Sequence, residues 1–286
     1  MGAADPPPAF VARRVTGRVD QRPPPRAVLA AFGARGEPVL LAGGKSGTWR
    51  AGDVVLKPAE GDDEVRWRSD VLEKLPESPA FRIARPIRAA GGDWLADGWE
   101  AARAVAGHPD QRRVDEVVRT GIAFHEVVAA VPRPSFLDTR SDPWSYGDSL
   151  AWEETPPRRS GKPSALLGAL LAARRPVHLS EQIVHGDLLG NVLFAEGLPP
   201  AVIDWAAYWR PAPWASAVAV VDAMVWHGED ESAITRWADQ PAWGQLLVRA
   251  AIYRLATWSA AGWSEEPEDA YRPAVRSVLN FVVRQV

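Results

Sequence analysis

The chain has 286 residues, of which 47% are hydrophobic and 24% are charged, so it can bury a large core and has the composition of an ordinary globular protein. The formal net charge of −3 gives no general attraction to nucleic acid or to an anionic membrane, and the absence of cysteine excludes disulfides, cysteine zinc sites and a thiol nucleophile. No segment approaches roughly 18 uncharged apolar residues and the N-terminus has no apolar signal core, so we expect a soluble, cytoplasmic protein.

The N-terminal part of the chain predicts a lead-in, a short helix and a small sheet. Residues 1–25 contain two proline triplets and are typical of an extended segment. Residues 25–32 predict a short helix that Gly33 stops. The segment 38–57 predicts a strand, a glycine-rich loop within 43–50, a second strand, a turn at 51–53 and a third strand at 54–57. The backbone N–H groups of such a hairpin can cover the phosphates of a nucleotide.

The dipeptide Lys45-Ser46 after Gly44 invites comparison with a P-loop, but the comparison fails. A Walker A motif needs a glycine five positions before Gly44, and Val39 stands there. It also needs a helix directly after the serine, whereas the following residues predict a strand and a turn. We therefore interpret the segment as a flap over phosphates rather than as a P-loop; the alternative is a plain hairpin turn.

The next segments complete a sheet and then change to long helices. Residues 62–75 predict a helix with an acidic first turn, and 81–87 and 94–99 predict further strands. Residues 110–131 are apolar with a period near 3.6 and predict a buried helix, in which His125 is interpreted as a core histidine. Further helices are predicted at 143–153, 164–174, 212–226, 231–239, 243–261 and 266–286, and Asp222 is expected to anchor the chain after Asp204.

The most informative stretch is 182–205, in which three acceptor side chains lie between short apolar runs. Asp187 and Asn191 follow the run Ile183-Val184, and Asp204 follows the run 201–203. Short strands are rigid supports, and the loops between them hold a carboxylate or an amide at a fixed point. A carboxylate that receives a hydroxyl proton, with an amide and a second carboxylate that hold magnesium, is the set that phosphoryl transfer to an alcohol requires.

This stretch resembles the catalytic and metal motifs of the aminoglycoside phosphotransferase and choline kinase superfamily. The resemblance is carried by His185-Gly186-Asp187, Asn191 and Ile203-Asp204-Trp205. Three residues separate Asp187 from Asn191, where the family usually has four, and Gly190 is expected to supply the backbone freedom of the tighter loop. The resemblance implies a bilobal, protein-kinase-like α+β fold, with an antiparallel N-lobe at 26–107 and a larger, mostly helical C-lobe at 108–286.

The same resemblance implies a role for individual residues. Asp187 would accept or orient the proton of the acceptor hydroxyl, while Asn191 and Asp204 would bind Mg²⁺. Lys57 would neutralise the phosphates of ATP; the alternative is a solvated lysine at a strand end. Glu64 would pair with Lys57, or would only be an acid at a helix N-terminus. The remaining nucleotide contacts would come from backbone groups of Gly44, Ser46, Gly47, Thr48, Arg103 and Val105.

The implied function is ATP-dependent phosphorylation of a hydroxyl on a small molecule, such as an aminoglycoside, a sugar or an amino alcohol. The alternative is a catalytically weak nucleotide-binding pseudokinase or scaffold module. Protein kinase activity is disfavoured because only a few residues separate Asp204 from the next helix, which leaves no room for an activation segment.

Overall fold

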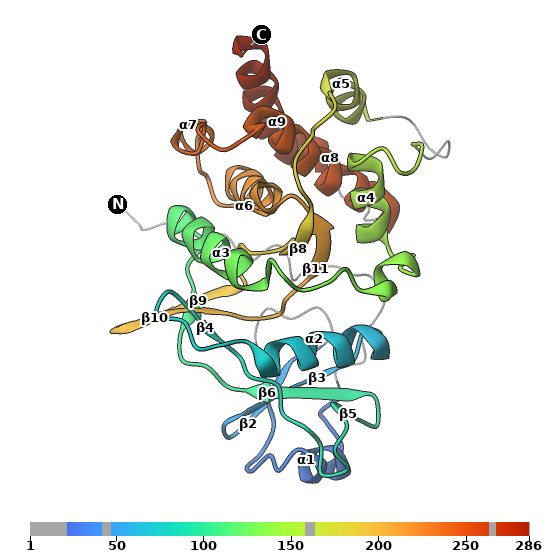
Figure 1. The fold of residues 1–286 in the computed structure, drawn as a ribbon, viewed down its shortest axis with the longest axis vertical. Coiled ribbons are helices and arrows are strands. Elements are labelled where there is room, and N and C mark those ends of the chain that lie inside the picture. The colour runs from blue at the N-terminus through green and yellow to red at the C-terminus, as the bar shows by residue number, and fades with distance from the viewer. Residues whose placement is uncertain (1–21, 42–46, 158–163, 263–266, 286) are drawn as a thin grey trace, which may run out of the picture. The chain divides into compact units, whose positions relative to one another are not determined.

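The computed structural model describes residues 22–41, 47–157, 164–262 and 267–285 (Figure 1). The chain forms two compact units. The first contains the residues up to Pro76 together with Ile83–Val105, and the second contains Glu77–Arg82 and the chain from Ala106 onward. The sequence placed the division after residue 107 and assigned 77–82 to the first unit. No helix among the described residues has the length and apolar character that a membrane crossing requires.

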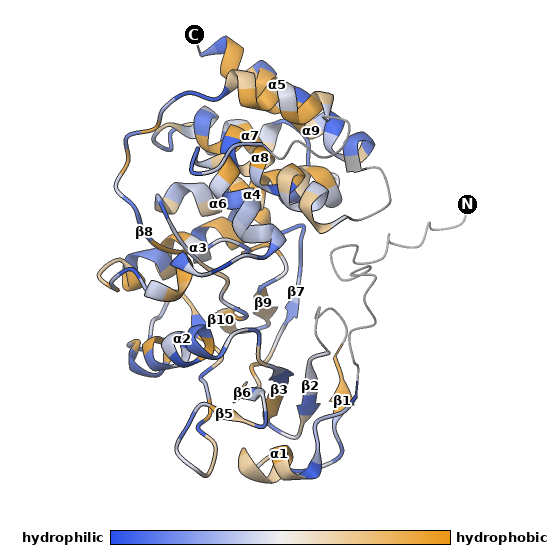
Figure 2. Cartoon of the chain, turned by 90° about the vertical axis from the view of Figure 1, so that its right-hand side faces the viewer, coloured by the Kyte–Doolittle hydropathy of each residue, from blue (hydrophilic) through white to orange (hydrophobic). Residues whose placement is uncertain are grey.

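The first unit is built on an antiparallel sheet with the order β1-β2-β3-β6-β5. Its strands are β1 (Val39–Leu40), β2 (Trp49–Ala51), β3 (Val54–Pro58), β5 (Leu95–Ala96) and β6 (Trp99–Arg103). Successive side chains of a strand point to opposite faces. On one face, Leu56 packs with Val28 and Phe32, which come from or directly follow α1 (Arg26–Ala31). On the other face, Glu100 meets Arg68 of α2 (Asp62–Lys74), a helix that carries both hydrophilic and apolar residues (Figure 2).

The second unit is mostly helical. Its helices are α3 (Val114–Val128), the 3₁₀ turn at Ser135–Asp138, α4 (Pro143–Ala151), α5 (Ala165–Ala173), α6 (Ala212–Trp226), α7 (Ser232–Arg236), α8 (Trp243–Ala261) and α9 (Pro267–Arg284). Helix α8 is buried along most of its length and packs against α4, α5, α6 and α9. A helix that is apolar nearly all round belongs in the centre of a core, and α8 occupies that place.

Short strands in the second unit carry the stretch that the sequence singled out. Strands β8 (Gln182–His185) and β11 (Ala207–Arg210) form an antiparallel pair, in which His185 lies opposite Ala207. Strands β9 (Val192–Ala195) and β10 (Leu198–Val202) form a hairpin within the order β4-β10-β9-β7, where β4 is Arg82–Ile83 and β7 is His108–Pro109. The predicted class, a small antiparallel sheet unit followed by a larger and mostly helical one, is confirmed.

Candidate catalytic site

The loop that carries Asp187 begins where β8 ends, and its backbone is held by close packing. The N–H of Gly186 donates to the carbonyl of Ala206, 2.9 Å away, which continues the pairing of β8 with β11. A Cβ atom at position 186 would clash with the Tyr208 ring and would lie 3.3 Å from the Trp214 ring. Glycine is therefore required before Asp187, because any side chain would push the loop off the aromatic layer beneath it.

His185 ties the Asp187 loop to the segment that leads to Asp204. The imidazole is fully buried, and its Nδ1 accepts a hydrogen bond from the Asp187 N–H at 3.2 Å. Because Nδ1 accepts, the neutral ring carries its proton on Nε2, which lies 3.1 Å from the Ile203 carbonyl and donates to it. His185 thus joins the two loops and fixes both.

Asn191 and Asp204 are brought together by the open end of the β9–β10 hairpin. Asn191 directly precedes β9, Ile203 directly follows β10, and the Ile203 N–H donates to the Asn191 carbonyl at 3.0 Å. Asp204 is exposed and has a left-handed backbone, with φ at 47°. The hairpin therefore presents an amide and a carboxylate at neighbouring positions, although the two residues are distant in sequence.

The amide of Asn191 is oriented by Asp187. Its Nδ2 donates to the Asp187 carbonyl at 2.7 Å and to Asp187 Oδ2 at 3.3 Å. This orientation leaves Oδ1 as the amide acceptor on the other side. An amide oxygen and an exposed carboxylate suit the hard, oxygen-preferring Mg²⁺ ion. Within the described ranges no group of three or more His, Cys, Asp or Glu side chains is arranged to hold a metal.

Gly190 closes the short loop between Asp187 and Asn191 with a left-handed backbone. Its φ is +93°, as the prediction of extra backbone freedom required, and the Asn191 N–H donates to the Leu188 carbonyl at 2.9 Å. The loop therefore tightens at Gly190 while the contact between Asn191 and Asp187 is kept.

Replacing Gly190 with alanine is expected to cost about 1–2 kcal/mol of unfolding free energy, because an L-residue is strained at this φ. A Cβ atom there would have no neighbour within 4 Å, so the loss would come from the backbone alone. Urea denaturation of Gly190→Ala measures it, and Gly168→Ala is the control, since Gly168 lies inside α5 with equally open space around it. Equal stability of Gly190→Ala and wild type would show that the loop accommodates the side chain without strain.

The sequence did not indicate the strongest partner of Asp187, which is Arg254 of α8. Arg254 Nη2 donates to Asp187 Oδ1 at 2.6 Å, and Arg254 Nε donates to Asp222 Oδ1 at 2.8 Å. Arg254 Nη2 also bonds to the second oxygen of Asp222. Asp222 of α6 was expected to anchor the chain after Asp204, and its observed partner is instead this arginine. One signal was present, because an arginine in a helix as apolar as α8 must find a buried acid.

The charge of Arg254 is stabilised by its two partners. Burial alone would lower the pKa of Arg254, but the Asp222 and Asp187 carboxylates outweigh it and hold that pKa well above its usual value. The Asp222 side chain is only 8% exposed, whereas the Asp187 side chain keeps 30% of its surface accessible. Asp187 is therefore the member of this triad that a ligand can reach.

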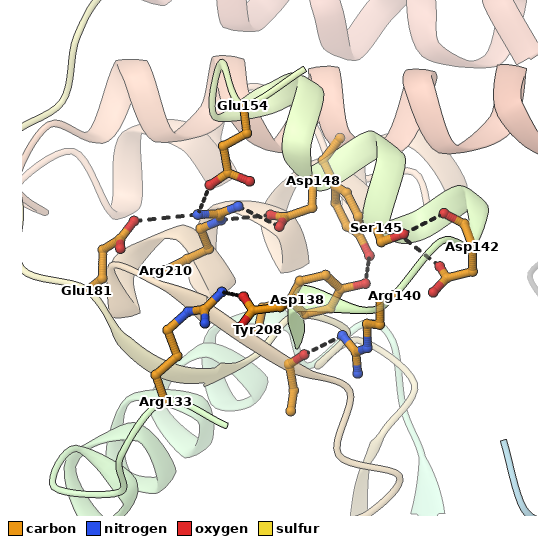
Figure 3. A network of polar contacts seen from close by, with 12 residues as sticks. Arg133, Asp138, Arg140, Asp142, Ser145, Asp148, Glu154, Glu181, Tyr208 and Arg210 are labelled. Atoms are coloured by element: carbon orange, nitrogen blue, oxygen red, sulfur yellow. Dashed lines mark hydrogen bonds and ion pairs between the residues drawn. The ribbon is translucent and has the colours of Figure 1, made fainter. Parts of the chain in front are cut away.

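A second buried arginine, Arg210, joins β11 to α4. Arg210 binds Asp148 through Nε at 2.9 Å and through Nη2 at 2.7 Å, and its Nη1 lies 2.8 Å from Glu154 and 3.5 Å from Glu181 (Figure 3). Burial lowers the pKa of Arg210, but the carboxylates outweigh that effect and raise it above its usual value. β11 pairs with β8, so this network positions the strand that precedes Asp187.

The candidate nucleotide residues of the first unit lie on and around β3 and β6. Lys57 of β3 lies opposite Glu100 of β6, with 3.6 Å between Nζ and Oε1. Arg68 Nη2 donates to both oxygens of Glu100 at 2.8 and 2.7 Å, and Glu64 lies 3.8 Å from Arg68. Glu100 is thus an acid near Lys57 that the sequence did not indicate, because a cross-strand partner is known only once the register is known. The pairing of Glu64 with Lys57 stays a prediction.

The other nucleotide-binding candidates are distributed around the same sheet. Gly47, with φ at 76°, and Thr48 directly precede β2, while Gly44 and Ser46 lie outside the described residues. The Arg103 N–H donates to the Arg85 carbonyl at 2.8 Å, so a contact between residue 103 and adenine would use another group of that residue. Val105 follows β6 at the end of the first unit.

This architecture is the fold of small-molecule phosphotransferases of known structure. The structure is similar to spectinomycin phosphotransferase APH(9)-Ia, solved with ADP and spectinomycin, at a TM-score of 0.57 and 13% identity over 91% of this chain and 97% of that one. It is also similar to a choline/ethanolamine kinase family protein from Mesorhizobium loti, at a TM-score of 0.57 and 17% identity over 91% of this chain and 98% of that one. A ternary complex of a thermostable mutant of aminoglycoside phosphotransferase APH(4)-Ia with ADP and hygromycin B has a TM-score of 0.55 and 15% identity, over 90% of this chain and 97% of that one. No family model and no curated protein sequence matches the chain.

Proposed function

We propose that this protein transfers the γ-phosphoryl group of ATP to a hydroxyl of a small molecule. The observation that carries the proposal is the arrangement of Asp187, Asn191 and Asp204, which His185 and the β9–β10 hairpin fix in one part of the second unit. Similarity to phosphotransferases of the same fold supports it. Fold alone does not determine activity, so the proposal rests on these side chains.

Asp187 is suited to receive the hydroxyl of the acceptor. Each carboxylate oxygen has two lone-pair sites, and Arg254 and Asn191 occupy one on each oxygen. Two sites therefore remain, and the carboxylate can accept the acceptor hydroxyl without losing its position. In the proposed step the hydroxyl oxygen attacks the γ-phosphorus, the bond from that phosphorus to the β–γ bridging oxygen breaks, and ADP departs. The hydroxyl proton passes to Asp187.

The two units contribute different parts of this chemistry. In the first, Lys57 and the backbone of Gly47 and Thr48 would bind the phosphates of ATP. In the second, Asn191 Oδ1 and the Asp204 carboxylate would hold Mg²⁺, which when bound neutralises charge on the phosphates. The acceptor would belong to the aminoglycoside, sugar or amino-alcohol class, because the similar proteins include two solved with spectinomycin or hygromycin B and one choline/ethanolamine kinase family protein.

The test is ADP release from ATP with and without magnesium, in the presence of separate pools of aminoglycosides, sugars, amino alcohols and nucleosides. Release that depends on magnesium and on one pool would support the proposal and begin to identify the acceptor. Tight ATP binding without turnover in any pool would instead favour the nucleotide-binding module without catalytic activity.

Asp204→Ala is expected to abolish the magnesium-dependent part of ATP binding in a calorimetric titration, because the variant loses the only charged donor of the proposed metal pair. Glu196→Ala is the matched control, since Glu196 is exposed at the opposite end of the same hairpin. The control should bind ATP as wild type does. Unchanged magnesium-dependent binding by Asp204→Ala would contradict its role as a metal ligand.

A further inference from the structure

We propose that Arg254 is a positioning residue, which sets the rotamer of the Asp187 carboxylate for catalysis. This inference rests on the proposed function and names a residue that the motif of the catalytic stretch does not contain. Its basis is the shared arginine, which contacts Asp222 through Nε and Nη2 and reaches Asp187 through Nη2.

The contact with Asp187 is additional to what the buried charge requires. Asp222 already offers both of its oxygens to the guanidinium, and such a bidentate pair neutralises the charge of a buried arginine by itself. The remaining N–H of Nη2 is directed to Asp187 Oδ1, at 2.6 Å. Because Asn191 binds the other oxygen, the two contacts fix the plane of the carboxylate, whose side chain keeps 30% of its surface accessible.

The guanidinium is itself held in place from several sides. Its central carbon lies 4.9 Å from the centre of the Tyr253 ring, and the Tyr253 hydroxyl lies 2.9 Å from the hydroxyl of Tyr208. Tyr208 belongs to β11, the strand that pairs with β8 directly before Asp187. Arg254 therefore connects the central helix α8 to the catalytic loop through two routes, one ionic and one aromatic. A lysine at this position would keep the charge but could not reproduce the fork of donors.

The test compares Arg254→Lys with Arg249→Lys, both in α8. Arg249 is also buried, and it pairs with Glu153 at 3.3 Å, which is not part of the site. We expect Arg254→Lys to lower kcat for phosphoryl transfer about 10- to 100-fold, because a carboxylate displaced by about 1 Å loses its alignment. The Kd for ATP should change less than about threefold, since the variant leaves the nucleotide-binding residues intact. Arg249→Lys should keep the wild-type kcat within about twofold.

A double-mutant cycle separates positioning from general stability. If Arg254 acts through Asp187, then Arg254→Lys lowers kcat in the wild type and has no further effect in the Asp187→Asn background. An equal loss in both backgrounds would overturn the inference. So would a kcat for Arg254→Lys that matches the Arg249→Lys control. If Arg254→Lys does not fold, Arg254→Gln, which keeps one donor group, takes its place in the same cycle.

Unfolding measurements, which need no catalysis, distinguish a failure of the proposed function from a failure of the role of Arg254. The same cycle is measured on urea unfolding midpoints in the absence of ligands, where a real Arg254–Asp187 contact gives non-additive shifts. A wild-type protein that turns over no acceptor would overturn the proposed function and the catalytic role of Arg254 together. An active wild type with additive unfolding midpoints and an unaffected Arg254→Lys would overturn only the role of Arg254.

Discussion

Asp187→Asn is expected to lower kcat at least ~100-fold, the usual effect of losing a positioned base, while the Kd for ATP stays within a few fold. The amide has nearly the same shape as the carboxylate but cannot receive the hydroxyl proton. The variant should still fold, because Asp222 continues to neutralise the buried guanidinium of Arg254. The measurement is the rate of ADP release in the acceptor pool that supports turnover, together with a calorimetric titration of ATP.

Asp239→Asn is the matched control for this experiment. It makes the same chemical change at an exposed aspartate that follows α7 and lies far along the chain from the site residues. Its kcat should equal that of wild type. Equal turnover by Asp187→Asn and wild type would remove Asp187 from the proposed mechanism, whereas a weakened Kd for ATP with normal kcat would indicate that Asp187 serves nucleotide binding instead.

The parts of the site that the sequence predicted are those with a local cause. The apolar runs around Val192 and Ala201 form β9 and β10, so the positions of Asn191 and Asp204 at the open end of a hairpin follow from neighbouring residues. Gly190 was expected to relieve a short loop, and its φ of +93° shows the conformation that only glycine adopts without strain. Where a short-range pattern fixes the backbone, the sequence is enough to place the side chain.

The features of the site that the sequence did not predict depend on contacts between distant segments of the chain. The sequence predicted no strand at 207–210, and these residues form β11 by pairing with β8. Arg254 lies 67 residues from Asp187 and Glu100 lies on a different strand from Lys57, so neither pair has a local signal. The need for glycine at position 186 likewise arises from the Tyr208 and Trp214 rings. Such features require the tertiary structure, because the packing itself determines them.

His125 is expected to make the stability of the protein depend on pH below about 6.5. Burial, and to a lesser degree the neighbouring His185, lower the pKa of His125 to about 3. Its Nε2 accepts the backbone N–H of His185 at 2.9 Å, and its Nδ1 has no hydrogen-bond partner in the part of the chain that the structure describes. Protonation would therefore replace an acceptor that supports the catalytic loop with a buried charge.

The direction of this pH dependence follows from the pKa of His125 in the unfolded and the folded protein. The unfolded chain binds a proton at this histidine near pH 6.5 and the folded chain only near pH 3, so His125 stabilises the fold fully above the first value. That contribution falls by about 1.4 kcal/mol per pH unit as the pH decreases, and the total loss is roughly 4–5 kcal/mol by pH 3. The measurement is the free energy of unfolding in urea between about pH 7 and about pH 4.5.

His125→Gln isolates this contribution from the carboxylates that also titrate in acid. A glutamine amide oxygen can accept the same His185 N–H but has no proton to gain, so wild type should be the more stable protein at pH 7, by about 1 kcal/mol for the better hydrogen bond. The advantage should shrink as the pH falls and reverse at about pH 6, because only wild type loses the stability of the neutral imidazole. His178→Gln, at an exposed histidine, should instead give a curve parallel to wild type. A parallel curve for His125→Gln would mean that the folded protein protonates His125 as readily as the unfolded chain does.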